Sequence, residues 1–400
     1  MRVIKDRSLM TAMVIISTAI CLRAPITSVG SVLHLIASDL NLNGTIAGTI
    51  TTIPLVVMAV LSPFISKIGT KLGTRLALML GLFILLMGIL IRSFAGFWGL
   101  LIGTAMIGAG ITFGNVLIPA LIKLCFPHKI GSMTGIFTTT MSICSGIGAG
   151  ISVPIAIEMG VGWRLTFCIW AGTTAIALII GLVWIINTPG YSGSSDDLVQ
   201  LDKLRNKKPL YKIPMVWSIV ILFGGQSSVF FMMATWLPTI IIDKGISAVT
   251  AGGIATVFQI AAIPANLATP IIAGRIKDQR ILALCVTGIG IVGLIGLTIG
   301  SNIVVLTIST AILSLSLGGT FSLSLVLFGM KTTTGEEAAR LSGFSQSAGY
   351  VMAAIGPAFA GYLYDISNNW NLPIGLAMGI LFMAAFAGFI AGKDKKIYEK

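Results

Sequence analysis

Long apolar segments, each followed by a short polar stretch, repeat along the whole chain. A helix of ~20 apolar residues, rising ~1.5 Å per residue, crosses the ~30 Å hydrocarbon core of a bilayer. The segments reach or approach that length and carry few charges, so each is expected to form one spanning helix. The pattern predicts an all-α membrane protein with twelve transmembrane helices, at residues 9–33, 46–65, 76–91, 97–122, 132–157, 163–186, 213–241, 249–273, 281–300, 303–330, 342–364 and 372–392.

The longest polar stretch divides these segments into two sets of six. It runs from Asn187 to Lys212, begins with Ser, Gly and Asp residues and continues into a basic run. Such a composition is typical of a hydrophilic linker. We therefore expect an N-terminal six-helix bundle at residues 1–187, a linker at residues 188–212 and a C-terminal six-helix bundle at residues 213–400.

The two halves share a sequence pattern at a nearly constant spacing. Asp39 recurs 204 positions later as Asp243, and Ala47-Gly48 recurs as Ala251-Gly252. Because each half has six predicted spans, the repeat is parallel, with its axis along the membrane normal. Twelve spans in such a repeat, with a central linker, describe the major facilitator architecture. Seven further pairs lie 208 positions apart: Gly110, Thr112, Phe113, Leu117, Lys123, Gly135 and Gly148 recur as Gly318, Thr320, Phe321, Leu325, Lys331, Gly343 and Gly356.

The basic residues are distributed unevenly between the two sides of the predicted membrane. With the N-terminus in the cytoplasm, the cytoplasmic stretches hold 22 of the 26 Lys and Arg residues. The external loops hold three, Arg92, Arg164 and Lys244, and Arg23 lies within the first span. Cytoplasmic loops of membrane proteins carry an excess of Lys and Arg. We therefore expect a multi-pass protein of the cytoplasmic membrane with both termini in the cytoplasm.

Composition agrees with this interpretation and excludes several functions. The chain of 400 residues is 56% hydrophobic and 10% charged, unlike a soluble domain. Membrane topology accounts for the net charge of +13, so nucleic-acid binding is not expected. Five cysteines without a CxxC pair and two separated histidines predict neither a disulfide framework nor a metal site. With no P-loop and no cluster of interfacial acids and histidines, we expect no cofactor and no enzymatic activity.

Arg23 is the only charge in the first span and lies near its centre. It follows Leu9 by 14 residues, which places it roughly 21 Å into the helix. An arginine at this depth costs about 2.5–3.5 kcal/mol and keeps its proton. Thr27, Ser31 and His34 follow it on one face of the helix. Pro25 leaves backbone carbonyls unpaired, which fits a helix bent around a cavity.

Two roles are open for Arg23: it binds a substrate, or it pins neighbouring helices through hydrogen bonds to their carbonyls. The positions of the 13 acidic residues bear on this choice, because all of them fall in predicted loops, termini or span ends. No carboxylate is therefore expected to face Arg23 inside the membrane, and an anionic or strongly dipolar substrate can be its partner. The same absence argues against a proton relay made of carboxylates.

Other polar side chains lie near the middle of their predicted spans, around the axis where the two halves would meet. Amides and a phenol can donate hydrogen bonds to a small polar solute. The structural alternative is interhelical hydrogen bonding, worth about 0.6 kcal/mol per bond. With Phe230 as an apolar or stacking wall, the candidate substrate-binding residues are Arg23, Thr27, Asn115, Gln226, Phe230, Gln259, Asn266, Gln346 and Tyr350.

The first span carries the best of several blocks that resemble a known family. The block LRAPITSVG, from Leu22 to Gly30, resembles the first-helix signature of the cyanate and 2-nitroimidazole porter family within the major facilitator superfamily. The chain departs from the superfamily pattern at Thr70, where an aspartate is usual in the loop between spans two and three. Further similar blocks, spread over nearly the whole chain, are NVLIPALIK from Asn115 to Lys123, Gly162-Trp163-Arg164, Gln226-Ser227 and Trp236-Leu237-Pro238.

These observations favour a secondary transporter that works by alternating access as a monomer in the lipid bilayer. Substrate would bind near the midplane between the halves, which rock around it. The resemblance implies a small anion such as cyanate, or a small nitro-heterocycle, as the transported molecule. The alternative is a drug or metabolite efflux transporter that uses the same central cavity. A membrane sensor or a lipid-modifying enzyme is not favoured, because the chain shows neither a signalling domain nor a catalytic cluster.

Overall fold

The computed structural model is built of long helices and describes residues 2–40, 44–188 and 209–399. The side chains of some helical residues, Ser31 and His34 among them, and most of the predicted linker lie outside this description. The N-terminal half contains α1 (Arg2–Asp39), α2 (Gly44–Leu72), α3 (Thr74–Phe94), α4 (Gly96–Cys125), α5 (Ile130–Val153) and α6 (Gly162–Asn187). The C-terminal half contains α8 (Pro214–Asp243), α9 (Ala248–Ile260), α10 (Ala262–Arg275), α11 (Arg280–Ile299), α12 (Ile303–Met330), α13 (Gly335–Ser367) and α14 (Asn371–Ala391).

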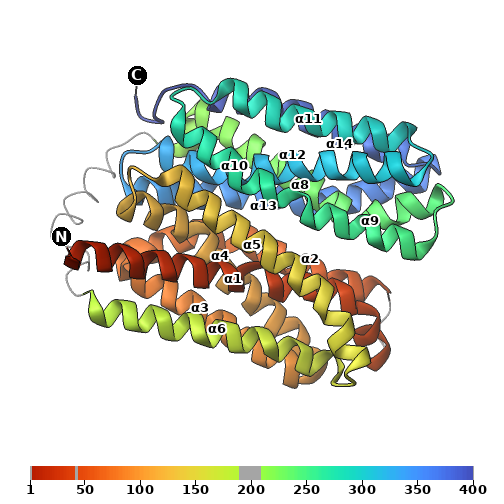
Figure 1. Ribbon diagram of the computed structural model, residues 1–400, viewed down its shortest axis with the longest axis horizontal. Coiled ribbons are helices and arrows are strands. Elements are labelled where there is room, and N and C mark those ends of the chain that lie inside the picture. The colour runs from red at the N-terminus through yellow and green to blue at the C-terminus, as the bar shows by residue number, and fades with distance from the viewer. Residues whose placement is uncertain (1, 41–43, 189–208, 400) are drawn as a thin grey trace.

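The helices form two bundles that lie side by side, one from each half of the sequence. Figure 1 shows the N-terminal bundle in red to yellow-green and the C-terminal bundle in green to blue. The start of α1 and the end of α14 lie at the same end of the molecule (Figure 1), which we call the terminal end. The opposite end is called the distal end. The prediction of an all-α protein with the major facilitator architecture is confirmed.

The helical spans agree with the predicted segments, although the helices are longer. In the described part of the chain, eleven helical stretches are long and apolar enough to cross a membrane, and one of them combines α9 and α10. The remaining predicted span corresponds to α13, whose 33 residues include Glu336, Glu337 and Arg340 in the first two turns. The part of the helix without charges, residues 341–364, also contains several Ser, Gly, Gln and Tyr residues, which lower its mean hydropathy.

Local sequence explains where two of the helices are interrupted. Pro264 has no N–H to donate to the carbonyl of Ile260, and the predicted span at residues 249–273 is divided at Ala261 into α9 and α10. Between α2 and α3 only Gly73 is not helical, and its φ of 81° suits a residue without a Cβ. The predicted loop at residues 66–75 is therefore a single-residue turn.

At the distal end, one carboxylate in each half accepts a hydrogen bond from a tryptophan. Asp39 at the end of α1 accepts from Trp163 Nε1 at 3.2 Å and pairs with Arg164 at 2.8 Å. Asp243 at the end of α8 accepts from Trp370 Nε1 at 2.7 Å. In both halves the bond joins the first helix to the last. The two pairs thus extend the internal repeat seen in the sequence to a three-dimensional contact.

The prediction that Arg92 lies in an external loop is wrong. Helix α3 continues to Phe94, and the Arg92 side chain is buried within the N-terminal bundle with 1% of its surface exposed. The apolar segment at residues 76–91 looked short because its last turn contains this arginine. With Arg92 inside the bundle, only Arg164 and Lys244 remain in the predicted external loops.

Candidate functional site

A cavity lies between the two bundles, near the middle of the helices. The space between atoms there is about 430 Å³, part of it open to solvent, and it is lined by α1 and α5 from the N-terminal bundle and by α8, α9, α10 and α12 from the C-terminal bundle. No carboxylate is present among the lining residues that the structure describes. Five of the nine candidate residues line it: Arg23, Gln226, Phe230, Gln259 and Asn266.

The guanidinium of Arg23 reaches across the cavity to aromatic rings of the other bundle. Its central carbon lies 4.9 Å from the centre of the Phe321 ring and 5.5 Å from that of Phe230. Phe230 in turn stacks on Phe258, with 5.6 Å between ring centres. Within the described residues, no hydrogen bond or ion pair to this guanidinium is present. Cation–π contacts worth about 0.5–2 kcal/mol each leave its five N–H donors for a ligand.

Several polar atoms on the cavity wall also have unused capacity for hydrogen bonds. Asn266 donates from Nδ2 to Ser142 Oγ at 2.6 Å, while its Oδ1 has no partner among the described residues. Ser145 Oγ, also in the lining, is likewise without a partner there. Gln226 accepts from Ser227 Oγ at 3.1 Å. The cavity thus combines one fixed cation, aromatic walls and amide or hydroxyl groups.

Asn115, Gln346 and Tyr350 lie together, but outside the cavity lining. Asn115 Nδ2 donates to Tyr350 Oη at 3.2 Å, and Gln346 Nε2 donates to the Asn115 carbonyl at 2.9 Å. These bonds join α4 of one bundle to α13 of the other. Because Asn115 is in the second half of α4 and Gln346 in the first half of α13, the cluster lies on the terminal side of the cavity.

The other hydrogen bonds between the bundles also lie at the cavity or on its terminal side. Ser347 Oγ donates to the Ala59 carbonyl at 2.6 Å, and Thr138 Oγ1 donates to the Asn266 carbonyl at 3.0 Å. At Gly343 an added Cβ would lie 2.7 Å from the Ser62 carbonyl, so the helices there are in close contact. In the described chain, the bundles are therefore joined more tightly toward the terminal end than toward the distal end.

Thr27 contacts protein atoms and does not line the cavity. Its hydroxyl lies 3.2 Å from the Arg23 carbonyl and 3.1 Å from the Ser145 carbonyl, so it links α1 to α5. The side chains of Ser31 and His34, which the sequence places on the same helical face, lie outside the described residues.

Sequence reasoning missed several lining residues, including Ser142, Ser145, Phe258, Ser314 and Phe321. The sequence singled out Phe321 in one way, because it is the repeat partner of Phe113. The two phenylalanines have different surroundings, since Phe113 packs in a separate apolar cluster of the N-terminal bundle. Nothing in the sequence marked the serines as lining residues, because small hydroxyl residues are common in tightly packed membrane helices.

Arg92 is a second buried arginine and was also missed. Its Nη1 donates to the Pro25 carbonyl at 2.8 Å, and its guanidinium carbon lies 4.0 Å from the centre of the Phe167 ring. Its Nε and Nη2 have no hydrogen-bond partner among the described residues. The contacts join α3 to α1 and α6 inside one bundle. The short apolar segment at residues 76–91 was the signal that could have identified it.

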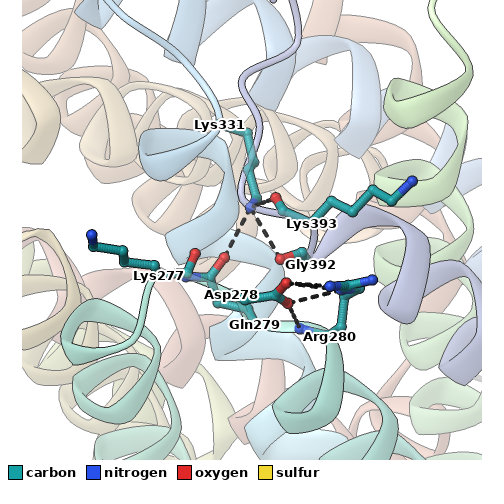
Figure 2. Close-up of polar contacts among 7 residues, drawn as sticks. All are labelled: Lys277, Asp278, Gln279, Arg280, Lys331, Gly392 and Lys393. Carbon is teal, nitrogen blue, oxygen red and sulfur yellow. Dashed lines mark hydrogen bonds and ion pairs between the residues drawn. The ribbon is translucent and has the colours of Figure 1, made fainter.

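Another buried cation, Lys331, lies at the terminal end of the C-terminal bundle and joins the ends of its helices (Figure 2). Its ammonium donates to Gln279 Oε1 at 2.8 Å, to the Gly392 carbonyl at 3.4 Å and to the Lys393 carbonyl. The Gln279 backbone N–H also donates to the Gly392 carbonyl at 2.9 Å. Burial lowers the pKa of Lys331 to about 8, although nearby Asp394 and Asp278 favour its charged form.

The sequence matches a known family and several relatives. Residues 14–357 match the family model described as Major Facilitator Superfamily. The chain is 39% identical over 385 residues to the uncharacterized transporter YycB of Bacillus subtilis (strain 168), covering 96% of this chain and 94% of that protein. It is 32% identical over 384 residues to the 2-nitroimidazole transporter of Escherichia coli (strain K12), covering 96% and 95%. It is 25% identical over 364 residues to the cyanate transport protein CynX of the same organism, covering 90% and 91%.

The fold also matches solved structures. The proton:xylose symporter XylE bound to 6-bromo-6-deoxy-D-glucose superposes with a TM-score of 0.76, covering 99% of this chain and 98% of that one. The two sequences are 12% identical, so this similarity concerns the fold alone.

Proposed function

Because the chain belongs to the major facilitator superfamily, a family of transporters, we propose that it moves a small anion or a small nitro-heterocycle across the cytoplasmic membrane by alternating access. The observation that carries this proposal is the guanidinium of Arg23. Arg23 lines the cavity, and its guanidinium lies beside two phenyl rings. The guanidinium has no hydrogen bond or ion pair within the described residues. A permanent cation at this depth is costly unless an anion or a dipole accompanies it.

The shape of the site supports a small, flat substrate. A guanidinium presents parallel N–H groups that can bind two oxygens at once, as on a nitro group or a carboxylate. Phe230 and Phe321 beside it provide surfaces on which a heterocycle can stack. The similarity to a 2-nitroimidazole transporter and to a cyanate transport protein supports the same choice. In this assignment the amides of Gln226, Gln259 and Asn266 orient the bound molecule.

Both bundles contribute residues to the site, so substrate binding can change how the bundles are arranged. Arg23 belongs to the N-terminal bundle, and the rings and amides around it belong to the C-terminal bundle. A substrate that contacts both sides stabilises the arrangement in which the bundles close around it. Release toward the terminal end then requires the loss of the contacts among Asn115, Gln346 and Tyr350. We assign these three residues to closure of the terminal end and not to direct substrate contact.

The direction in which the cavity opens follows from the distribution of charge. Basic residues are concentrated at the terminal end, which we assign to the cytoplasm. Closure on that side makes the present arrangement outward-facing. Single cysteines at Asn302 and Lys277, introduced into a cysteine-free variant, test the assignment with an impermeant thiol reagent. In intact cells the reagent should label Asn302→Cys and should not label Lys277→Cys; the reverse pattern would overturn the orientation.

An efflux transporter for drugs or metabolites is the second candidate. The aromatic group of Phe230, Phe258 and Phe321 favours it, because such a wall also accommodates larger apolar molecules. The two functions differ in their dependence on Arg23. Binding of a neutral apolar compound should survive Arg23→Gln, whereas binding of an anion or a nitro compound should not.

A thermal-shift screen of the purified protein tests the proposal. Cyanate, 2-nitroimidazole and small carboxylates are added to the wild type and to Arg23→Gln, since a ligand of the folded state raises the melting temperature. We expect at least one of these compounds to stabilise the wild type and not the variant. If none does, while neutral apolar drugs stabilise both proteins equally, the efflux function replaces the one proposed.

A further inference from the structure

A second pocket lies between the two bundles, at the terminal end and away from Arg23. The space between atoms there is about 850 Å³, part of it open to solvent, and it is lined by the end of α4, the loop that follows it, the start of α5 and the ends of α10 and α12. Four of its lining side chains, Lys123, His128, Lys129 and Arg275, are basic or can become so, and none of its lining residues is acidic. Nothing in the transport cycle proposed above uses these residues.

The protein neutralises the basic side chains of this pocket only in part: Glu337 lies near enough to Lys123 to favour its charged form, while Lys396 opposes it. Within the described residues, no ion pair or side-chain hydrogen bond of Lys123, His128, Lys129 or Arg275 is present. The start of α5 adds partial positive charge, because no side chain caps the helix, which runs for 24 residues from Ile130. Like charges gathered in one pocket repel one another unless an anion lies among them.

Apolar groups on the same wall indicate that the anion carries a hydrophobic part. Ile130, Ile271 and Met330 line the pocket beside the basic residues. Leu267 and Ile272 of α10 are 39% and 45% exposed, so the helix that carries Arg275 also presents apolar side chains at its surface. A basic pocket at the end of membrane-spanning helices, with apolar side chains in its lining, suits a phospholipid better than a freely soluble ion.

We propose that this pocket binds the phosphate group of an anionic phospholipid, and that the bound lipid holds the two bundles together at the terminal end. Lys123 and Lys129 come from the N-terminal bundle and Arg275 from the C-terminal bundle. The bundles are already in close contact here, since an added Cβ at Gly131 would lie 2.1 Å from the Pro270 carbonyl oxygen. One phosphate can therefore neutralise charges from both sides of the contact, whatever the transported substrate is.

Binding of defined lipids to the full chain in detergent tests the charge requirement. The probes are dioctanoyl phosphatidylglycerol, dioctanoyl phosphatidylcholine and inorganic phosphate, and binding is followed by the rise in melting temperature. We expect phosphatidylglycerol to stabilise the wild type more than the other two probes. The double variant Lys129→Gln/Arg275→Gln should bind it about tenfold more weakly, the loss expected for charge-assisted hydrogen bonds. Lys277→Gln, an exposed lysine outside the lining, is the matched control and should bind as the wild type does.

A pair of glycine variants tests whether both bundles must be in contact. Gly131→Leu keeps every basic residue but inserts a side chain at the crossing of α5 and α10, which forces the bundles apart. Gly150→Leu adds the same side chain on the same helix where an added Cβ meets no atom within 4 Å. We expect Gly131→Leu to lose preferential binding of phosphatidylglycerol and Gly150→Leu to retain it.

Three outcomes would overturn the proposal. Equal stabilisation by phosphatidylglycerol and phosphatidylcholine would show that the charge of the headgroup is not recognised. Equal stabilisation by inorganic phosphate would assign the pocket to a soluble anion. Loss of binding in Lys277→Gln as large as in the double variant would show attraction to the general positive charge of this end. Each protein's melting temperature without a probe identifies variants that fail to fold, and the Lys/Arg and glycine variants provide independent tests.

Discussion

Arg23 is partly buried and Arg92 is fully buried in the N-terminal half of the protein, and their surroundings differ. Arg92 lies inside one bundle, donates to the Pro25 carbonyl and packs against Phe167 of the same bundle. Arg23 lies at the boundary between bundles and touches only rings of the other bundle through its guanidinium, among the contacts that the described residues show. The pinning role that the sequence left open for Arg23 is the one whose geometry Arg92 has. The two arginines therefore differ in their access to the cavity, which Arg23 lines and Arg92 does not.

The largest expected effect is the loss of substrate binding in Arg23→Gln. A lost charge-assisted hydrogen bond is worth about 1.5–3 kcal/mol, or roughly a 10- to 150-fold drop in affinity. Arg23→Lys should be intermediate, because an ammonium keeps the charge but lacks the planar fork. Stability should change little, since removing an unpaired cation relieves its desolvation cost. The dissociation constant and the melting temperature are measured on the same preparation. A destabilised variant with wild-type affinity would show that Arg23 holds helices together, as Arg92 does, and does not bind substrate.

Arg92→Met should give the opposite pattern. The variant loses the hydrogen bond to the Pro25 carbonyl, which costs about 1.5–3 kcal/mol for a bond from a charged donor, and relief of the desolvation cost of Nε and Nη2 offsets part of that loss. We expect a lower melting temperature and lower yield, with substrate affinity close to that of the wild type in the protein that folds. Binding curves and melting curves of Arg92→Met beside Arg23→Gln complete the comparison. A stable Arg92→Met variant that has lost substrate affinity would contradict it.

Phe321→Leu should produce a smaller change at the Arg23 site. The contact between the guanidinium and this ring is worth about 0.5–2 kcal/mol, which corresponds to about a 2- to 30-fold loss of substrate affinity if the ring holds the guanidinium in place. Phe113→Leu is the matched control, because Phe113 occupies the corresponding repeat position and packs in an apolar cluster without a cation. It should lower the melting temperature and leave the dissociation constant unchanged. Equal dissociation constants in both variants would show that the Phe321 ring does not position the guanidinium for substrate binding.

The last prediction concerns stability alone and the buried cation Lys331, which has three oxygen acceptors (Figure 2). Its pKa is about 8 in the folded protein against an ordinary 10.5, so the unfolded chain binds more protons between these pH values. The free energy of unfolding should therefore rise with pH across that window, and the contribution is lost as the pH falls through about 8. Lys331→Met should remove this part of the pH dependence, whereas exposed Lys395→Met should keep it. Melting temperatures measured from pH 7.5 to 10.5 test the difference, and identical slopes in wild type and Lys331→Met would contradict it.

The sequence predicts the fold well because the membrane restricts it strongly. Each spanning segment must satisfy its own backbone hydrogen bonds, so an apolar segment of sufficient length forms a helix. The repeat of Asp39 as Asp243 then showed that the halves are equivalent, and the structure adds a tryptophan partner to each. The sequence pattern did not show where α3 ends, because the last turn of that helix carries a charged residue. Arg92 looked like a loop residue because its partners, Pro25 and Phe167, are distant in the sequence.

The candidate site was predictable in part. Five of the nine candidates, chosen because they lie near the centres of spans, line the cavity. Which of them faces the cavity depends on how each helix is rotated about its axis and how far it is shifted along the membrane normal. These are tertiary quantities, and a single sequence does not contain them. Asn115 and Tyr350 contact each other because α4 and α13 meet on the terminal side of the cavity.

The bonds from Asp39 to Trp163 and from Asp243 to Trp370 have a consequence for how the chain is made. Each bond joins the end of the first helix to the start of the last helix of one half, so a half is complete only when its last helix has been inserted into the membrane. The N-terminal half has both of its partners by residue 163, long before α8 is synthesised. Domains generally fold as units during synthesis, N-terminal first. The first half can thus finish its packing while the ribosome is still translating the second.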